Sequence, residues 1–221
     1  MISIVEITYL GYSSFKIRGK NVTVVTDPFS HESIGISYPP TDADIVTVSH
    51  NHNGHNAIKQ IGGQPFVISA PGEYEVKDVM IFGIPYFHDA SQGSEKGKNT
   101  AYLIEVEGLR LCHLGDLGHT LSPEQLNGLS EGVDILFLPV GGGSALGPRE
   151  AAELVGKIEP STVIPMHYQT PGLKKELFDQ LLPVEDFLKE VDGQTAPIPK
   201  LVVTREKVIE EGQVVVLEKK G

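Results

Sequence analysis

The segment Ser49 to Asn56 reads Ser-His-Asn-His-Asn-Gly-His-Asn and places three of the eight histidines of the chain within six positions. An apolar run with the composition of a buried strand leads into it. Side chains two residues apart on an extended backbone point the same way, so His50 and His52 can present their imidazoles to one metal ion. A turn at Gly54 can bring His55 to a neighbouring ion. The segment therefore predicts a metal site at the end of a strand.

Other apolar runs end in residue types that bind metals. Asp27, His113 and His167 each follow directly on such a run. Strand ends are held rigidly by a sheet, and this favours a common site to which several of them contribute. Gly115 permits a sharp turn after His113, which can bring the Asp116 carboxylate to the same centre.

The expected ligands are imidazoles and carboxylates. Zinc, manganese and iron all accept this set, and zinc is favoured here. The absence of cysteine ligands favours an open catalytic site over a closed structural one. The chemistry indicated is hydrolysis by a metal-bound water, because the metal lowers the pKa of that water and polarises the bond under attack.

Composition sets broad limits on class and partners. The 221 residues suffice for one large domain, residues 1–221, and the net charge of −11 does not favour nucleic acid as a partner. No apolar run approaches the ~20 residues of a membrane span, and the first residues lack the pattern of a signal peptide. We therefore expect a cytoplasmic protein with no membrane partner. The single cysteine, Cys112, excludes an internal disulfide and is interpreted as a buried hydrophobic residue.

Short apolar segments separated by Gly, Pro and Asp turns predict a mixed α/β domain with helices outside the sheets. The expected strands cover residues 4–10, 14–17, 21–26, 44–49, 65–69, 79–85, 101–106, 109–113, 134–140, 162–166, 200–204 and 214–218. Helices are expected near His55 or Asn56 and over residues 123–129, 148–158 and 184–191. Residues 91–99, rich in Gly, Ser and Lys, are expected to form a mobile loop near the site.

Taken in order from Leu10 to Tyr168, these motifs resemble the metallo-beta-lactamase superfamily, and in particular the small metal-dependent hydrolases grouped with ascorbate-6-phosphate lactonase. His50, His52 and His55 match the family signature His-x-His-x-Asp-His, with Gly54 where Asp is expected. The family's Leu-Gly-His-Ser-Ser start is matched from Leu10 to Ser14, with Tyr12 replacing the usual histidine.

The resemblance implies a four-layer αββα sandwich with the metals at one edge. One ion would take His50, His52 and His113, and a second would take His55 and His167. Asp116 would bridge the two and hold the attacking water, and Asp27 would support the site from below. Because Gly54 removes a carboxylate from the second position, one or two ions are expected.

Three further residues are secondary candidates for contact with substrate. His88 follows an apolar strand, His119 lies three residues past Asp116, and Tyr168 adjoins His167. The alternatives are a surface or supporting role for His88, a helix start for His119, and simple packing for Tyr168.

Two functions remain open from the sequence. The first is a metal-dependent hydrolase that uses a metal-bound hydroxide on a small ester, lactone or phosphoester. The alternative is a non-catalytic or weakly active relative that binds a metal or ligand, because Gly54 replaces the signature Asp. A nuclease is disfavoured by the acidic charge, the expected partner is a small-molecule substrate, and formation of a homo-oligomer is left open.

Overall fold

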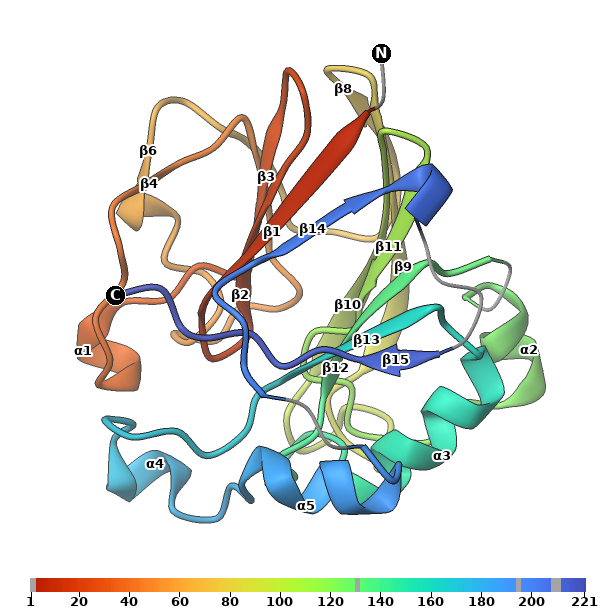
Figure 1. The fold of residues 1–221 in the computed structure, drawn as a ribbon. Helices are drawn as coiled ribbons and strands as arrows, with labels where there is room; N and C mark the ends of the chain where they lie inside the picture. The colour runs from red at the N-terminus through yellow and green to blue at the C-terminus, as the bar shows by residue number, and fades with distance from the viewer. Residues whose placement is uncertain (1–2, 130–131, 194–195, 208–211) are drawn as a thin grey trace.

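The chain forms two mixed β-sheets that face each other (Figure 1). We describe the fold from a computed structural model, which describes residues 3–129, 132–193, 196–207 and 212–221. The first sheet has the order β14 (Leu201–Thr204), β1 (Ile4–Gly11), β2 (Ser14–Arg18), β3 (Thr23–Thr26), β5 (Ile45–Thr47) and β7 (Phe66–Ile68). The second has the order β15 (Gln213–Val214), β13 (Thr162–Met166), β12 (Ile135–Pro139), β11 (Leu109–His113), β10 (Lys98–Val106), β9 (Val79–Phe87) and β8 (Gly72–Val76).

Each sheet combines a parallel and an antiparallel part. Strands β3, β5 and β7 are parallel, as are β11, β12, β13 and β15. The remaining neighbours pair antiparallel, beginning with the β1–β2 hairpin and the β9–β10 pair. In the parallel parts, the carboxyl ends of neighbouring strands lie along one edge of each sheet, which is where ligand sites of such sheets form.

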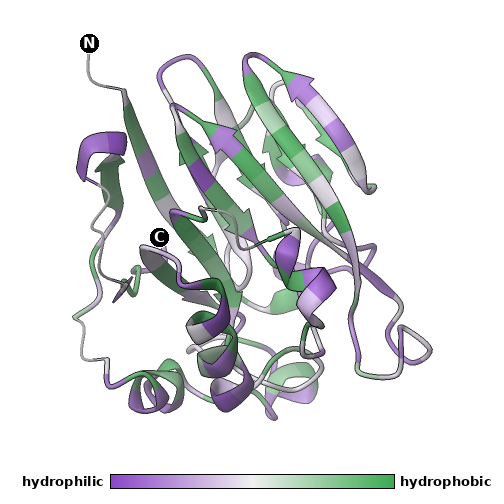
Figure 2. Cartoon of the chain, turned by 90° about the vertical axis from the view of Figure 1, so that its right-hand side faces the viewer, coloured by the Kyte–Doolittle hydropathy of each residue, from purple (hydrophilic) through white to green (hydrophobic). Residues whose placement is uncertain are grey.

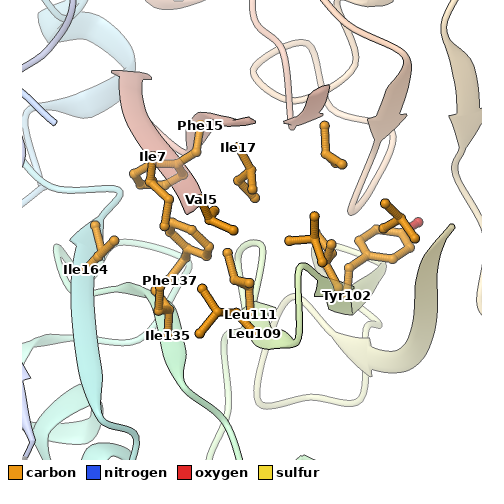
Figure 3. Close-up of a cluster of buried hydrophobic side chains, with 14 of the residues drawn as sticks. Val5, Ile7, Phe15, Ile17, Tyr102, Leu109, Leu111, Ile135, Phe137 and Ile164 are labelled. Atoms are coloured by element: carbon orange, nitrogen blue, oxygen red, sulfur yellow. The ribbon is translucent and has the colours of Figure 1, made fainter. Parts of the chain in front are cut away.

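The main hydrophobic core lies between the two sheets. Figure 3 shows Ile7 and Phe15 of the first sheet facing Phe137 of the second, and the rings of Phe15 and Phe137 lie 4.4 Å apart. Central strands are buried on both faces: Val24 belongs to this core, and the next residue, Val25, belongs to a cluster on the outer face of the first sheet. A continuous apolar run is therefore required in β3.

The outer layers are unequal in size. Helices α3 (Pro148–Ile158) and α5 (Val184–Glu190) cover the second sheet, and α2 (Pro123–Asn127) lies beside them (Figure 1). Helix α3 buries Ala151, Leu154 and Ile158, whose spacing puts them on one face. The elements that cover the first sheet, within the described part of the chain, are short: the single turn α1 (His31–Ile34), the pair β4 (Thr41–Asp42) and β6 (Ile61–Gly62), and the 3-10 turn Ile58–Gln60. In Figure 2 hydrophobic residues dominate the strands and hydrophilic ones the helices.

The predicted four-layer αββα architecture is confirmed, with α1 and the helix α4 (Lys175–Phe178) as additions that the sequence did not predict. The short strand β8 was also not predicted. Ser122 caps α2 through a capping box, and Pro123 is the first residue of this helix. No helix among the described residues has the length and apolar character needed to cross a membrane.

Two predicted elements are wrong. The helix expected near His55 is a series of turns followed by the 3-10 turn Ile58–Gln60, because the segment is bent around the site. The strand expected over residues 214–218 pairs in β15 only as far as Val214, and an isolated bridge joins Leu217 to Ile198.

Candidate metal centre

The predicted strand-end residues come together at one edge of the sandwich. Asp27 directly follows β3, His167 directly follows β13, and Asp116 lies three residues past β11. The segment from His50 to His55 lies in the turns after β5. Strands from both sheets therefore supply the site, and the sandwich fixes their separation.

Asp116 lies among four imidazoles. Its Oδ2 atom lies 3.0 Å from His55 Nε2, 3.2 Å from His167 Nε2, 3.4 Å from His88 Nε2 and 3.8 Å from His50 Nε2. The carboxylate is 2% exposed, so water does not screen these contacts. Gly115 makes the turn that positions Asp116: its φ is +57°, and a Cβ there would lie 2.3 Å from Asn99 Oδ1. The Asp116 N–H donates to that same Asn99 oxygen.

Asp27 supports two of these histidines on the side of each ring away from Asp116. It accepts hydrogen bonds from the Ser49 N–H, the Ser49 hydroxyl and His55 Nδ1, at 2.7, 2.6 and 2.9 Å. Because the Ser49 hydroxyl donates to Asp27, it accepts from His50 Nδ1 at 2.8 Å. Both His50 and His55 therefore carry a proton on Nδ1, which leaves Nε2 of each ring as the atom that faces the site and that a metal ion would bind. Asp27 thus has the supporting position expected from the sequence.

His88 has the same arrangement by a different route. Its Nδ1 donates to the Ser144 carbonyl oxygen at 3.3 Å, which leaves the Nε2 lone pair directed at Asp116. One ligand atom each from His50, His52 and His88 lie within 4.8 Å of one another, and Asp27, His50 and His55 form a second such group. His52 is exposed, whereas His50 and His88 are buried. His88 therefore lies where it could bind a metal ion, a role that the sequence analysis did not give it.

His113 differs from the predicted ligand set. Its Nε2 donates to the Ser13 carbonyl oxygen at 2.8 Å, and its Nδ1 accepts from the Gly115 N–H at 3.2 Å. Both ring nitrogens are thus used by the backbone, and neither offers a lone pair to a metal. The side chain is fully buried and instead ties the β1–β2 turn to the turn that carries Asp116.

The charges of the cluster are strongly coupled. Burial lowers the pKa of His55, but the charges of Asp116 and Asp27 outweigh burial and raise that pKa to about 10. Burial and the charge of His55 lower the pKa of His50 to about 2. The pKa of Asp116 is well below its usual value, because His167 and His55 outweigh the effect of burial. In the metal-free protein the centre therefore contains carboxylates, a protonated His55 and a neutral His50.

Three buried polar atoms at the centre have no hydrogen-bond partner: His50 Nε2, Asp116 Oδ1 and His167 Nδ1. Buried polar atoms are nearly always satisfied, so such atoms require an explanation. His50 Nε2 and Asp116 Oδ1 are imidazole nitrogen and carboxylate oxygen, the donor types that Zn²⁺, Mn²⁺ and Fe²⁺ bind. The residues present therefore fit a divalent metal ion.

A cavity of about 440 Å³ opens onto the cluster. Its wall includes Tyr12, Phe178 and Leu181, and among the described residues Lys96 is the one lysine that lines it. Four histidines also line it: His52, His55, His88 and His167. Lys96 belongs to the loop between β9 and β10, where the sequence predicted a loop near the site. The Asp89 carboxylate organises this loop by accepting four backbone N–H groups, those of Ser91, Gly93, Glu95 and Lys96.

The two remaining candidates do not line this cavity. His119 lines a neighbouring one, accepting from the Phe87 N–H and donating to the Thr120 carbonyl oxygen. Tyr168 is 6% exposed and packs in the hydrophobic cluster between the second sheet and its helices. Of the three secondary candidates, the structure brings only His88 to the centre.

The architecture and the site together define a class of protein: a sandwich of two mixed sheets with a histidine and aspartate metal centre at one edge. Residues 6–167 match the family model described as the beta-lactamase superfamily domain, and the chain belongs to this superfamily.

Similar proteins are found by sequence and by structure. A "UPF0173 metal-dependent hydrolase" of Thermococcus onnurineus is 30% identical in an alignment 192 positions long, which covers 75% of this chain and 85% of the relative. A crystal structure of a Thermotoga maritima protein of the metallo-beta-lactamase superfamily is 37% identical, with a TM-score of 0.78 over 97% of this chain and 98% of that chain. A metallo hydrolase of Ignicoccus hospitalis, 20% identical, has the same fold, with a TM-score of 0.65 over 91% and 98% of the two chains.

Proposed function

We propose that the protein is a metal-dependent hydrolase that acts on a small ester, lactone or phosphoester. The observation that carries the proposal is the set of buried Nε2 lone pairs directed at the Asp116 carboxylate, with His50 Nε2 and Asp116 Oδ1 unsatisfied. The names of the relatives, metal-dependent hydrolase for the Thermococcus onnurineus protein and Zn-dependent hydrolase for the Thermotoga maritima protein, support it.

In this proposal His50, His52, His88 and Asp116 hold a divalent ion, and zinc suits the set best. A bound ion of this kind supplies a water of lowered pKa and polarises the bond under attack. Asp27, through Ser49, keeps the His50 proton on Nδ1, and the Ser144 carbonyl oxygen does the same for His88. These hydrogen bonds orient the ligands before any substrate arrives.

The cavity supports a small substrate. Its volume of about 440 Å³ lies within the range of small-molecule sites. Phe178 and Leu181 offer apolar lining, and Lys96 offers a cation. A substrate that combines a small apolar part with an anionic group fits this lining.

The test compares two histidines that the sequence alone does not distinguish. Metal content, metal affinity and turnover of lactone, aryl ester and phosphodiester substrates are measured for wild type, His88→Gln and His113→Gln. We expect wild type to hold metal and hydrolyse at least one substrate. His88→Gln loses at least tenfold in metal affinity with little change in Tm, because one ligand is removed.

His113→Gln is the matched control. We expect it to lower Tm, because both ring nitrogens bond the backbone, and to retain the metal. Metal loss in His113→Gln with an unchanged Tm, beside full metal in His88→Gln, contradicts the ligand set. A wild-type protein that holds metal and turns over none of the substrates supports the alternative, a metal-binding relative without catalysis.

A further inference from the structure

The two departures from the family signature, Tyr12 and Gly54, lie against each other. A Cβ at Gly54 would lie 3.1 Å from Tyr12 Cε1 and 3.0 Å from Ile34 Cδ1, closer than ordinary side-chain contacts. The backbone of Gly54 is outside the left-handed region, so its conformation does not demand glycine. The crowding comes from the Tyr12 ring and the Ile34 methyl group, which together occupy the space where a side chain at position 54 would begin.

The Tyr12 hydroxyl is bonded to a predicted ligand of the second ion. It lies 2.8 Å from His167 Nε2, the same nitrogen that faces Asp116 Oδ2. The Tyr12 ring is tilted against the imidazoles of His55 and His167, with centroids 5.2 and 4.7 Å away. The phenol therefore stands between the two histidines that the resemblance assigns to the second ion.

The backbone fixes this position. The Tyr12 carbonyl oxygen accepts from the His167 N–H at 2.9 Å and from the Tyr9 hydroxyl at 3.0 Å. Tyr12 has a left-handed φ of 56° and a side chain 5% exposed, so the ring is held within the site rather than turned to solvent.

The two halves of the centre differ in their free donor atoms. His50 Nε2 has no hydrogen-bond partner, whereas His55 Nε2 lies 3.0 Å from Asp116 and His167 Nε2 lies 2.8 Å from Tyr12. The half with His50, His52 and His88 thus keeps a free lone pair on His50. In the half with His55 and His167, the Nε2 atoms that face the site both have partners within the protein.

We propose that Tyr12 closes the second metal position and that the chain binds a single divalent ion, through His50, His52, His88 and Asp116. Tyr12 is a positioning residue: it holds His167 by a hydrogen bond and excludes a second ion by filling its place. Gly54 is the complement that makes room for the ring. This inference rests on the proposed function, because it assumes that the first position binds metal.

The test is the number of ions bound by the full chain. Equilibrium dialysis against Zn²⁺ with elemental analysis gives equivalents per chain, and titration with Co²⁺ gives the number of sites from absorption. The proteins are wild type, Tyr12→Phe, and the double variant Tyr12→Ala with Gly54→Asp. Ala at position 12 adds no backbone strain beyond that of Tyr, since both have a Cβ at the same φ. The matched control is Tyr168→Ala with Gly54→Asp, which removes a buried tyrosine outside the cavity.

We expect one equivalent for wild type and for Tyr12→Phe, because the ring alone fills the space. The double variant should bind two, with the new carboxylate joining His55 and His167, while the Tyr168 control binds no more than one. Two equivalents in wild type overturn this inference and leave the proposed function standing, whereas none overturns both. Loss of the ion in Tyr12→Phe makes the phenol oxygen a ligand and overturns the inference. One equivalent in a double variant with a native circular dichroism spectrum and wild-type Tm also overturns it.

Discussion

Replacing Asp27 with Asn tests whether hydrogen bonds behind the centre control metal binding. The substitution keeps the shape of the side chain and exchanges one oxygen for an NH₂ group. The Ser49 N–H is a donor, so the Asn oxygen must stay where Asp27 Oδ1 accepts from it. The NH₂ group then occupies the place of Oδ2, facing the Ser49 hydroxyl and His55 Nδ1.

This exchange reverses the order of donors. The NH₂ group donates to the Ser49 oxygen, and the Ser49 hydroxyl turns to donate to His50 Nδ1. His50 then carries its proton on Nε2 and loses the lone pair directed at the metal. His55 Nδ1 becomes an acceptor in the same way, so one substitution changes the tautomer of two histidines.

The expected loss is about 100-fold in metal affinity. Removing one such supporting partner costs about 10- to 100-fold, or about 1.4 to 2.8 kcal/mol. Asp27 supports the ligand His50 through Ser49 and also His55, which contacts the ligand Asp116, so the upper end of that range applies. Ser49→Ala cuts only the path to His50 and should fall between Asp27→Asn and wild type.

The assay is competition for Zn²⁺ with a chromophoric chelator at pH 7.5. Asp134→Asn is the matched control, since Asp134 is 6% exposed, accepts from the Arg110 N–H and pairs with Arg205 at the opposite end of β11. We expect its metal affinity to equal that of wild type. An Asp27→Asn protein that binds Zn²⁺ within threefold of wild type refutes the tautomer argument.

Three further outcomes are expected. In metal-free protein the raised pKa of His55 stabilises the fold fully below pH 6.5, and that stabilisation is lost as pH rises through about 10; Tm should fall over this window in wild type and stay flatter in His55→Gln. Lys96→Met should raise KM about two- to fivefold for an anionic substrate and leave a neutral analogue unchanged, because an exposed cation contributes modestly. Phe137→Ala should lower the free energy of unfolding by about 3–5 kcal/mol in urea titrations, because it empties the core opposite Phe15; a loss under 1 kcal/mol contradicts that packing.

Strand positions were largely predictable from the sequence, because burial of one or both faces of a strand determines the spacing of its apolar residues. Val24 and Val25 enter different hydrophobic clusters, and consecutive apolar residues satisfy both. The turns around His55 were not predictable, since the hydrogen bonds that shape them come from Asp27, far away in the chain. Local propensity favoured a helix there and tertiary contacts overrode it.

The placement of His88 and His113 shows where a pattern ceases to be informative. Each lies at the end of an apolar strand, so position alone does not separate them. The separation depends on which ring nitrogen meets a backbone group: His88 leaves Nε2 free of the backbone, and His113 leaves neither nitrogen free. The two partners of the His88 hydrogen bond are separated by 56 positions in the chain, and those of the His113 hydrogen bond by 100. The sequence around each histidine therefore does not indicate its partner.

Gly54 alone indicates a missing carboxylate, and hence a weakened site. Considered with Tyr12, it indicates that a hydrogen bond replaces a metal ligand. The Tyr12 phenol bonds His167, where an Asp at position 54 would have bound the second ion. A lost ligand with nothing in its place would leave two buried imidazoles facing an apolar gap, and buried polar groups without partners are costly. The Tyr12 ring and hydroxyl remove that cost. The single variants Gly54→Asp and Tyr12→Ala should therefore each be less stable than wild type and than the double variant. A double-mutant cycle on Tm should show that the two positions are coupled.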